Sequence, residues 1–225
     1  MNWEELSIII PVGPDEHEHV YLLKDLTPLF GKSEIICVFA KGSEKTVDNV
    51  KCISASQGRA NQLNEGAKAA NRKYLWFIHA DSRIMKESFL GLKKAIYNAP
   101  DKLSYFNLKY TVEEGRQFRI NEWGIRLRSR IFGVPFGDQG FLINKDIFFD
   151  SGGYPVTVDY GEDHIFIWKL RQRGIKLNCI SNYLESSPRK YREYGRIKLM
   201  IKYQKMWIKQ AMPEVIIFLK SRGVL

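Results

Sequence analysis

The sequence has little cysteine and no long apolar run. Its three cysteines, Cys37, Cys52 and Cys179, have neither a CxxC spacing nor an even count. They therefore predict no disulfide framework and favour a reducing compartment. No stretch approaches the roughly 18 apolar residues that a membrane span requires, and the acidic residues 1–5 lack the basic and apolar regions of a secretory signal. We expect a cytoplasmic protein, soluble or peripheral at the inner face of a membrane.

Basic residues outnumber acidic ones by 35 to 25, which gives a formal net charge of +10 and a pI near 9.4. This excess favours an anionic partner, but nucleic acid, a membrane surface and a phosphorylated small molecule satisfy it equally well. The 44% hydrophobic and 13% aromatic content are typical of a globular chain with a sizeable core.

Predicted strands and helices alternate along the chain. We expect strands at 6–11, 34–40, 50–54, 74–79, 103–112, 140–144 and 175–180, and helices at 20–30, 58–71, 86–98 and 163–173. This alternation predicts an α/β fold with a largely parallel sheet. We expect one main domain at 1–187, followed by a basic amphipathic helical appendage at 188–225.

Two acidic clusters, far apart in the sequence, are candidate chemical groups. Asp81 follows the apolar segment 74–78, which is typical of a buried strand, and α/β sheets bind ligands beyond the carboxyl ends of their strands. Glu162 and Asp163 open a predicted helix. A structural alternative stays open for both clusters, because acidic and hydroxyl side chains also cap helices and stabilise their first turns.

Five short segments carry a family signal: LSIIIPV at 6–12, QGRANQLNEGA at 57–67, HADSR at 79–83, GDQG at 137–140 and ED at 162–163. Their order and spacing resemble those of family 2 glycosyltransferases with the GT-A fold, and the strings are most similar to the subgroup of arsenosugar-biosynthesis glycosyltransferases. The resemblance spans residues 6–195. It implies a single GT-A-type nucleotide-diphospho-sugar transferase domain, with a mixed, mostly parallel central sheet flanked by helices.

The resemblance implies that a sugar moves from a nucleoside-diphosphate donor to an acceptor hydroxyl with inversion. The residue that matches Asp81 binds the donor and a divalent cation, Mn²⁺ or Mg²⁺, which stabilises the departing diphosphate. Asp163 matches the catalytic base, which removes the proton from the acceptor hydroxyl in a single displacement. Arg83 replaces the second acid of a DxD triplet, where its guanidinium is a candidate phosphate contact.

Other substrate contacts follow from the same resemblance. The further candidate donor contacts are Pro11, Arg59 and Asn64. The candidate acceptor contacts are Asp138, Gln139 and Glu162. Arg59 near a helix N-terminus suits an anion, and the two glycines around Asp138 and Gln139 permit a tight turn. An ordinary solvated arginine and a plain turn remain the structural alternatives.

Two basic amphipathic segments, 116–132 and 189–209, alternate cationic with apolar side chains. Such segments can lie on an anionic membrane surface, although a terminal helix that packs on the domain would give the same pattern. The expected partners are a nucleotide-sugar donor, a hydroxylated acceptor and an anionic membrane surface, with nucleic acid disfavoured.

Two other functions are weighed against the transferase. A nucleotidyltransferase also places acids near a diphosphate, but its glycine-rich phosphate loop near the N-terminus is missing here. A non-catalytic adaptor for nucleic acid or membrane, with a degenerate sugar-nucleotide pocket, would bind in a strongly salt-dependent way and would be indifferent to Asp163.

Overall fold

The computed structural model describes residues 3–111, 115–158, 160–187, 196–221 and 223, with side chains except at 115–120 and 196–204. The strands are β1 (Leu6–Val12), β2 (Glu34–Ala40), β3 (Lys51–Ala55), β4 (Tyr74–Phe77), β5 (Ser82–Ile84), β6 (Leu103–Tyr110), β7 (Phe141–Asn144) and β8 (Leu177–Ser186). The α-helices are α1 (His19–Leu26), α2 (Arg59–Ala69), α3 (Lys86–Asn98), α4 (Gly115–Arg130), α5 (Lys145–Asp150), α6 (Glu162–Gln172) and α8 (Arg196–Ser221). The 3-10 helices are η1 (Trp3–Glu5), η2 (Thr27–Leu29) and η4 (Gly137–Gln139).

The described strands form one eight-stranded sheet in the order β3-β2-β1-β4-β7-β6-β8-β5. Neighbours from β3 to β4 are parallel, and β7 runs antiparallel between β4 and β6. β8 is parallel to β6, and β5 is antiparallel to β8 at the edge. The predicted α/β fold with a mixed, mostly parallel sheet is therefore confirmed.

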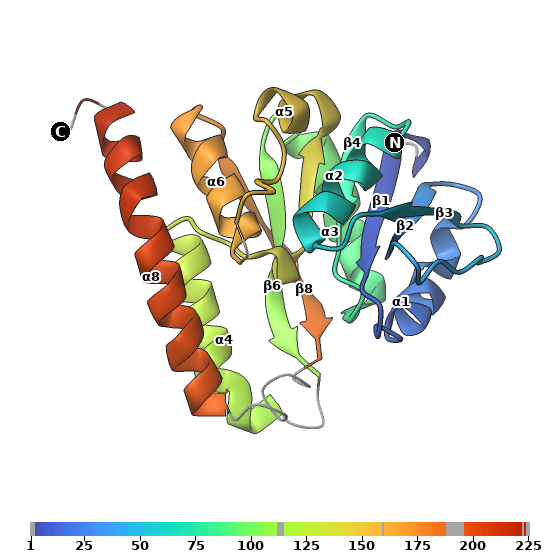
Figure 1. Cartoon of the computed structure of the whole chain (residues 1–225), viewed down its shortest axis with the longest axis horizontal. Helices are drawn as coiled ribbons and strands as arrows, with labels where there is room; N and C mark the ends of the chain where they lie inside the picture. The colour runs from blue at the N-terminus through green and yellow to red at the C-terminus, as the bar shows by residue number, and fades with distance from the viewer. Residues whose placement is uncertain (1–2, 112–114, 159, 188–195, 222, 224–225) are drawn as a thin grey trace.

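Helices cover both faces of the sheet (Figure 1), because its central strands are apolar on both sides. α1 and α3 pack on one face, where Leu22, Leu26 and Leu92 are fully buried. α2, α5 and α6 pack on the other face, where Phe148 and Phe166 are fully buried. The helix expected at 58–71 thus contributes Ala60, Leu63 and Ala67 to the core.

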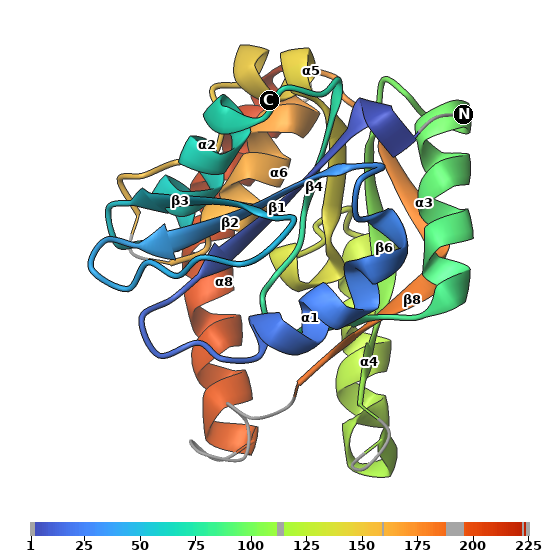
Figure 2. The same ribbon diagram turned by 90° about the vertical axis from the view of Figure 1, so that its right-hand side faces the viewer.

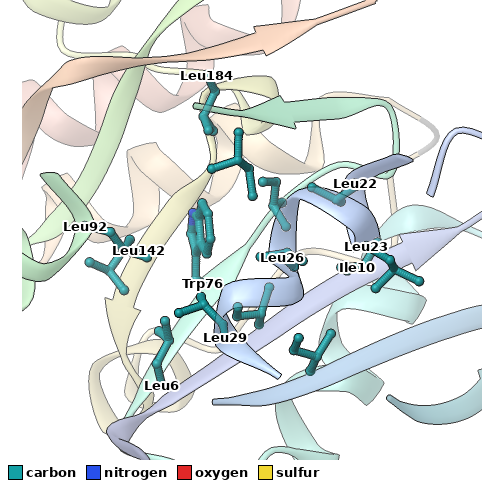
Figure 3. Packing of buried hydrophobic residues seen from close by; sticks show 14 of the residues in the cluster. Leu6, Ile10, Leu22, Leu23, Leu26, Leu29, Trp76, Leu92, Leu142 and Leu184 are labelled. Carbon is teal, nitrogen blue, oxygen red and sulfur yellow. The ribbon is translucent and has the colours of Figure 1, made fainter. Parts of the chain in front are cut away.

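Trp76 of β4 lies among leucines of β1, β7, β8, α1 and α3 (Figure 3). Gly140, which follows η4, approaches this ring closely and has a φ of 62°. A Cβ at this position would lie 2.7 Å from Leu184 Cδ1 and 3.1 Å from Trp76 Nε1. The last glycine of the GDQG string is therefore required by both the backbone conformation and the packing.

α4 and α8 are long helices that extend past the end of the sheet (Figures 1 and 2). Ile125 of α4 packs on Leu108 and Tyr110 of β6. α8 packs on α6, with Ala211 and Trp168 in one buried cluster. None of the helices in the described ranges is long and apolar enough to cross a membrane.

Several predicted boundaries change in the structure. The helix expected at 20–30 is divided into α1 and η2, because Pro28 has no N–H with which to continue the α-helical ladder. β5 was not predicted, since its three residues become a strand only by pairing with β8. The expected domain boundary falls at residues 188–195, outside the described residues, as do most side chains of the 189–209 segment. The division into 1–187 and 188–225 remains a prediction.

Candidate functional site

The candidate site lies beyond the carboxyl ends of β1, β2 and β4. Asp81 follows β4 in a turn that the Ser82 N–H closes by donating to the His79 carbonyl at 3.1 Å. Three more segments reach this edge: the N-terminus of α2, the η4 turn and the N-terminus of α6 (Figure 1). Their charged side chains interact electrostatically, so residues far apart in the sequence form one cluster.

Asp163 is held by backbone N–H groups. Its Oδ2 accepts a hydrogen bond from the Gly137 N–H at 2.7 Å, and its Oδ1 accepts from the His164 N–H at 2.7 Å. A Cβ on Gly137 would lie 2.9 Å from His79 Nε2 and 3.3 Å from Asp163 Oδ2. Gly137 therefore allows η4, His79 and the Asp163 carboxylate to approach one another closely. Asp163 remains partly exposed, as a group that meets a substrate must be.

Arg59 is the cation that faces this acidic group. Its Nη1 lies 3.2 Å from Glu162 Oε1, and 41% of its side-chain surface is exposed, against 9% for Glu162. Desolvation would lower the pKa of Arg59, but the charges of Glu162, Asp163, Asp81 and Asp138 outweigh it and raise that pKa. One guanidinium thus interacts with four carboxylates at the N-terminus of α2.

Asp138 carries an unusual carboxylate. Burial raises its pKa to about 6; Arg128 opposes the shift, while the charges of Asp163 and Asp81 add to it. Its Oδ1 is buried and has no hydrogen-bond partner among the described residues. The cluster contains four carboxylates and two arginines, Arg59 and Arg128, so by count its negative charge is in excess.

No group of three or more His, Cys, Asp or Glu side chains in the described part of the chain is arranged to hold a metal ion. Mg²⁺ sites that also bind phosphates use only one or two carboxylates and complete the shell with phosphate oxygens and water. The excess negative charge around Asp81 and Asp138 fits a cation bound in this way, together with a diphosphate.

Arg83 points to a different neighbour. Its Nε and Nη2 donate to the two carboxylate oxygens of Asp25 at 2.7 and 2.9 Å, and Asp25 Oδ2 also accepts the Ile84 N–H at 3.0 Å. Arg83 thereby joins β5 to α1, and its proposed phosphate contact would require a change of partner.

Two further candidates have their polar atoms engaged by the fold. The Asn64 amide donates to the Tyr154 carbonyl at 2.8 Å and accepts the Tyr154 N–H at 2.9 Å. The buried Gln139 side chain donates to the Phe106 carbonyl at 2.8 Å and accepts the Phe136 N–H at 3.2 Å. Both side chains shape the loops around the site.

Pro11 lies buried in β1, next to a connection that the sequence interpretation missed. Gln62 Nε2 donates to the carbonyls of Val12 and Val38 at 2.8 and 2.7 Å, so it joins the carboxyl ends of β1 and β2. Gln62 lies within the QGRANQLNEGA string at 57–67, and nothing in the sequence pattern indicated its burial.

The contributions of His79, Gly137 and Arg128 were also missed. His79 belongs to the HADSR string, and the structure brings it against Gly137. Arg128 of α4 is buried: its Nε donates to the Val134 carbonyl at 3.1 Å, and its guanidinium lies 3.3 Å from the Phe136 ring centroid. The glycines of GDQG were a usable signal for the close approach at Gly137, while Arg128 lay within a repetitive basic segment.

Comparisons with known proteins agree with this architecture. A family model described as Glycosyl transferase family 2 matches residues 34–157, more than half of the chain. The match includes Arg59, Asp81 and Asp138, and it ends before Glu162 and Asp163. A comparison with curated proteins found no match.

Solved structures with the same fold include S. aureus TarS. One TarS structure has 17% sequence identity and a TM-score of 0.60, with 84% of this chain and 38% of that chain covered. TarS 1-349 has 16% identity and a TM-score of 0.62, with 84% and 62% covered. A complex of TarS 1-349 with UDP-GlcNAc has 15% identity and a TM-score of 0.59, with 81% and 58% covered. This chain thus spans less than two thirds of each of these TarS chains.

Proposed function

The chain belongs to glycosyl transferase family 2, and from this premise we propose that it transfers a sugar from a nucleoside-diphosphate donor to an acceptor hydroxyl with inversion. The observation that carries the proposal is the cluster of Arg59, Asp81, Asp138, Glu162 and Asp163 at the carboxyl edge of the sheet. The HADSR and GDQG strings support assignment to the arsenosugar-biosynthesis subgroup.

Asp81 and Arg59 are the residues of the cluster that we propose bind the donor. Arg59 can turn from Glu162 to the diphosphate, because its side chain is partly exposed and sits at a helix N-terminus that favours anions. Asp81 would hold a divalent cation together with the diphosphate oxygens. The charges of Asp81 and Asp138 interact, so such a cation would also offset the charge of Asp138. Such a cation would neutralise the departing diphosphate as a Lewis acid.

Asp163 is the proposed base. Its carboxylate is oriented by the Gly137 N–H, and its partial exposure leaves it open to an acceptor. Removing the hydroxyl proton as the oxygen attacks the anomeric carbon, on the face opposite the leaving diphosphate, gives inversion in one step. Glu162 and Asp138 are the proposed acceptor contacts, and Pro11 and Asn64 remain proposed donor contacts.

Calorimetry with UDP, GDP, ADP and their common sugar conjugates, with and without Mn²⁺, tests the donor site. We expect saturable binding of one nucleotide and about 10-fold or greater weakening in Asp81→Ala. Asp101→Ala, which removes an exposed acid, is the matched control. Absence of nucleotide binding to the native chain under every metal condition would overturn the proposal and favour the adaptor.

Analysis of the reaction products distinguishes a glycosyltransferase from a nucleotidyltransferase. Sugar transfer releases a nucleoside diphosphate, whereas a nucleotidyltransferase exchanges pyrophosphate. Asp163→Asn should bind the donor normally and lose about 100-fold or more in turnover, because it retains the shape but not the basicity of the carboxylate. NMR of the product determines its anomeric configuration. Retention of the donor's configuration would reject the single-displacement mechanism.

We also propose that the protein works at the cytoplasmic face of an anionic membrane. The outer surface of α8 exposes Ile208, Met212 and Ile216 beside Lys205 and Lys209, a pattern that suits a membrane interface. Vesicles containing phosphatidylserine should co-sediment the protein at low salt, and Met212→Asp with Ile216→Asp should abolish this. Failure of the native chain to bind such vesicles would reject the membrane proposal and leave the transferase proposal intact.

A further inference from the structure

A side chain from the C-terminal helix reaches the turn that carries the proposed base. Gln210 of α8 donates from Nε2 to the Tyr160 carbonyl at 2.7 Å, and its Oε1 lies 3.0 Å from His164 Nε2. Between these two contacts lies Gly161, at which a Cβ would be 2.6 Å from both Gln210 Oε1 and His164 Nε2. The amide therefore packs directly against the backbone of the turn.

The hydrogen bonds determine how the His164 ring is protonated. Because a carbonyl only accepts, the Gln210 group that meets Tyr160 must be the NH₂, which leaves Oε1 to accept from His164 Nε2–H. The buried His164 Nδ1 has no hydrogen-bond partner among the described residues. An Nδ1 without a proton avoids burying an unpaired N–H, so the Nε2–H tautomer fits this network.

The turn needs such support, because it is not stabilised in the usual way. Gly161 is the N-cap residue of α6, has a φ of 76° and offers no side chain to the first turn of the helix. The next two residues are Glu162, which pairs with Arg59, and Asp163. A change in the path of Gly161 would therefore move both carboxylates.

Other contacts hold α8 on α6 without Gln210. Trp168 and Phe218 pack edge to face with ring centroids 5.9 Å apart, and Gln172 Nε2 donates to Glu214 Oε2 at 2.8 Å. Ala211 is buried in the same interface. Removal of the Gln210 amide should consequently leave the two helices packed while it releases the turn.

We infer that Gln210 is a positioning residue for Asp163, and that α8 is a working part of the active site. This inference rests on the proposed function. Gln210 touches neither substrate nor reacting atoms; it orients the Tyr160–Asp163 turn so that the base faces the acceptor. Chain truncations that remove α8 would therefore impair catalysis as well as any contact at its outer surface.

Gln210→Ala tests the inference, with Lys220→Ala as the exposed control on the same helix. We expect kcat to fall about 10- to 100-fold in Gln210→Ala, because misplacement of a catalytic group by about 1 Å has effects of this size. The donor KM should stay within about 2-fold, since Asp81 and Arg59 lie on other segments than the turn that Gln210 contacts. Lys220→Ala should match the native enzyme.

Two further measurements exclude a general loss of structure. Backbone amides of residues 160–164 should exchange hydrogen faster in Gln210→Ala, while those in the middle of α6 and the thermal midpoint stay unchanged. The ¹⁵N shifts of His164 should move away from the Nε2–H tautomer. In Gln210→Glu, which keeps the acceptor but loses the donor to Tyr160, exchange at the turn should lie between that of the native chain and the alanine variant.

The outcomes separate the two levels of the proposal. If the native chain transfers no sugar from any donor, the proposed function fails. Even then, hydrogen exchange at residues 160–164 that is unchanged in Gln210→Ala would by itself overturn the positioning role. If the native chain is active and Gln210→Ala keeps its kcat within about 2-fold, the inference is wrong while the transferase stands.

Discussion

The guanidinium of Arg83 and the carboxylate of Asp25 form a two-point ion pair, with N to O distances of 2.7 and 2.9 Å. Asp25 also accepts the Ile84 N–H, so the pair fixes the end of β5 against α1. The hydrogen bond to Asp25 is the main reason that the pKa of Arg83 is raised. At the position where a DxD triplet has its second acid, this chain thus has a residue with a structural partner.

Arg83→Ala should therefore reduce stability more than donor affinity. We expect the free energy of unfolding to fall by about 1 kcal/mol, since the arginine is partly exposed but bidentate. Denaturant unfolding of Arg83→Ala, Asp25→Ala and the double variant should reveal coupling, with the double variant less destabilised than the sum. Unchanged stability with a 10-fold loss of nucleotide affinity would instead assign Arg83 to the diphosphate.

Gly137→Ala should impair catalysis by crowding. The added Cβ would lie 2.9 Å from His79 Nε2 and 3.3 Å from Asp163 Oδ2, so it must displace one of them. We expect kcat to fall about 10-fold or more, with the Asp163 carboxylate moved from its hydrogen bond to the Gly137 N–H. Gly124→Ala, at an exposed position with nothing within 4 Å of the new Cβ, is the control. Equal kcat values for the two variants would contradict the close approach.

Asn64→Ala should reveal whether this amide supports the fold or the donor. Its two hydrogen bonds to the Tyr154 backbone, 2.8 and 2.9 Å long, join α2 to the segment before α6. Their loss should lower the free energy of unfolding by about 1–3 kcal/mol, because a partly buried N–H and carbonyl lose their partner. Asn61→Ala, which removes one longer local hydrogen bond of 3.2 Å, should cost less. A stable Asn64→Ala that binds nucleotide poorly would support the direct donor contact.

The main features of the fold could be predicted from sequence patterns. The apolar runs at β1, β2 and β4 are nearly continuous, so they indicated strands buried on both faces and a ligand edge at Asp81. β5 could not be predicted, since it is short and depends on pairing with β8, more than 90 residues later in the sequence. The break between α1 and η2 follows from Pro28. It is a local effect on one helix boundary.

The site was partly predictable for a related reason. Arg59, Asp81, Asp138, Glu162 and Asp163 lie in short recognisable strings, and the structure brings them together. Which polar atoms remain available was not predictable, because that depends on long-range partners. Residue type and spacing do not indicate whether a side-chain amide binds a substrate or a backbone carbonyl.

Asp138→Asn should stabilise the protein at neutral pH. Folding raises the Asp138 pKa from 3.8 to about 6, so the folded state holds a proton that the unfolded state releases between these values. Stability is therefore lost as pH rises from about 4 to about 6, and the loss reaches at most ~3 kcal/mol above that range. An asparagine has no charge to bury, so the variant should unfold at the native temperature near pH 4 and at a higher temperature at pH 7.

Thermal unfolding of both chains without nucleotide or divalent metal, at several pH values between 4 and 8, measures this difference. Asp101→Asn, at an exposed position, should follow the native curve throughout. Nucleotide and cation should then narrow the gap between the native chain and Asp138→Asn, because a bound cation stabilises the ionised Asp138 carboxylate. An Asp138→Asn protein less stable than the native chain at pH 7 without ligands would show that the ionised carboxylate is already well compensated by Arg128 and Arg59.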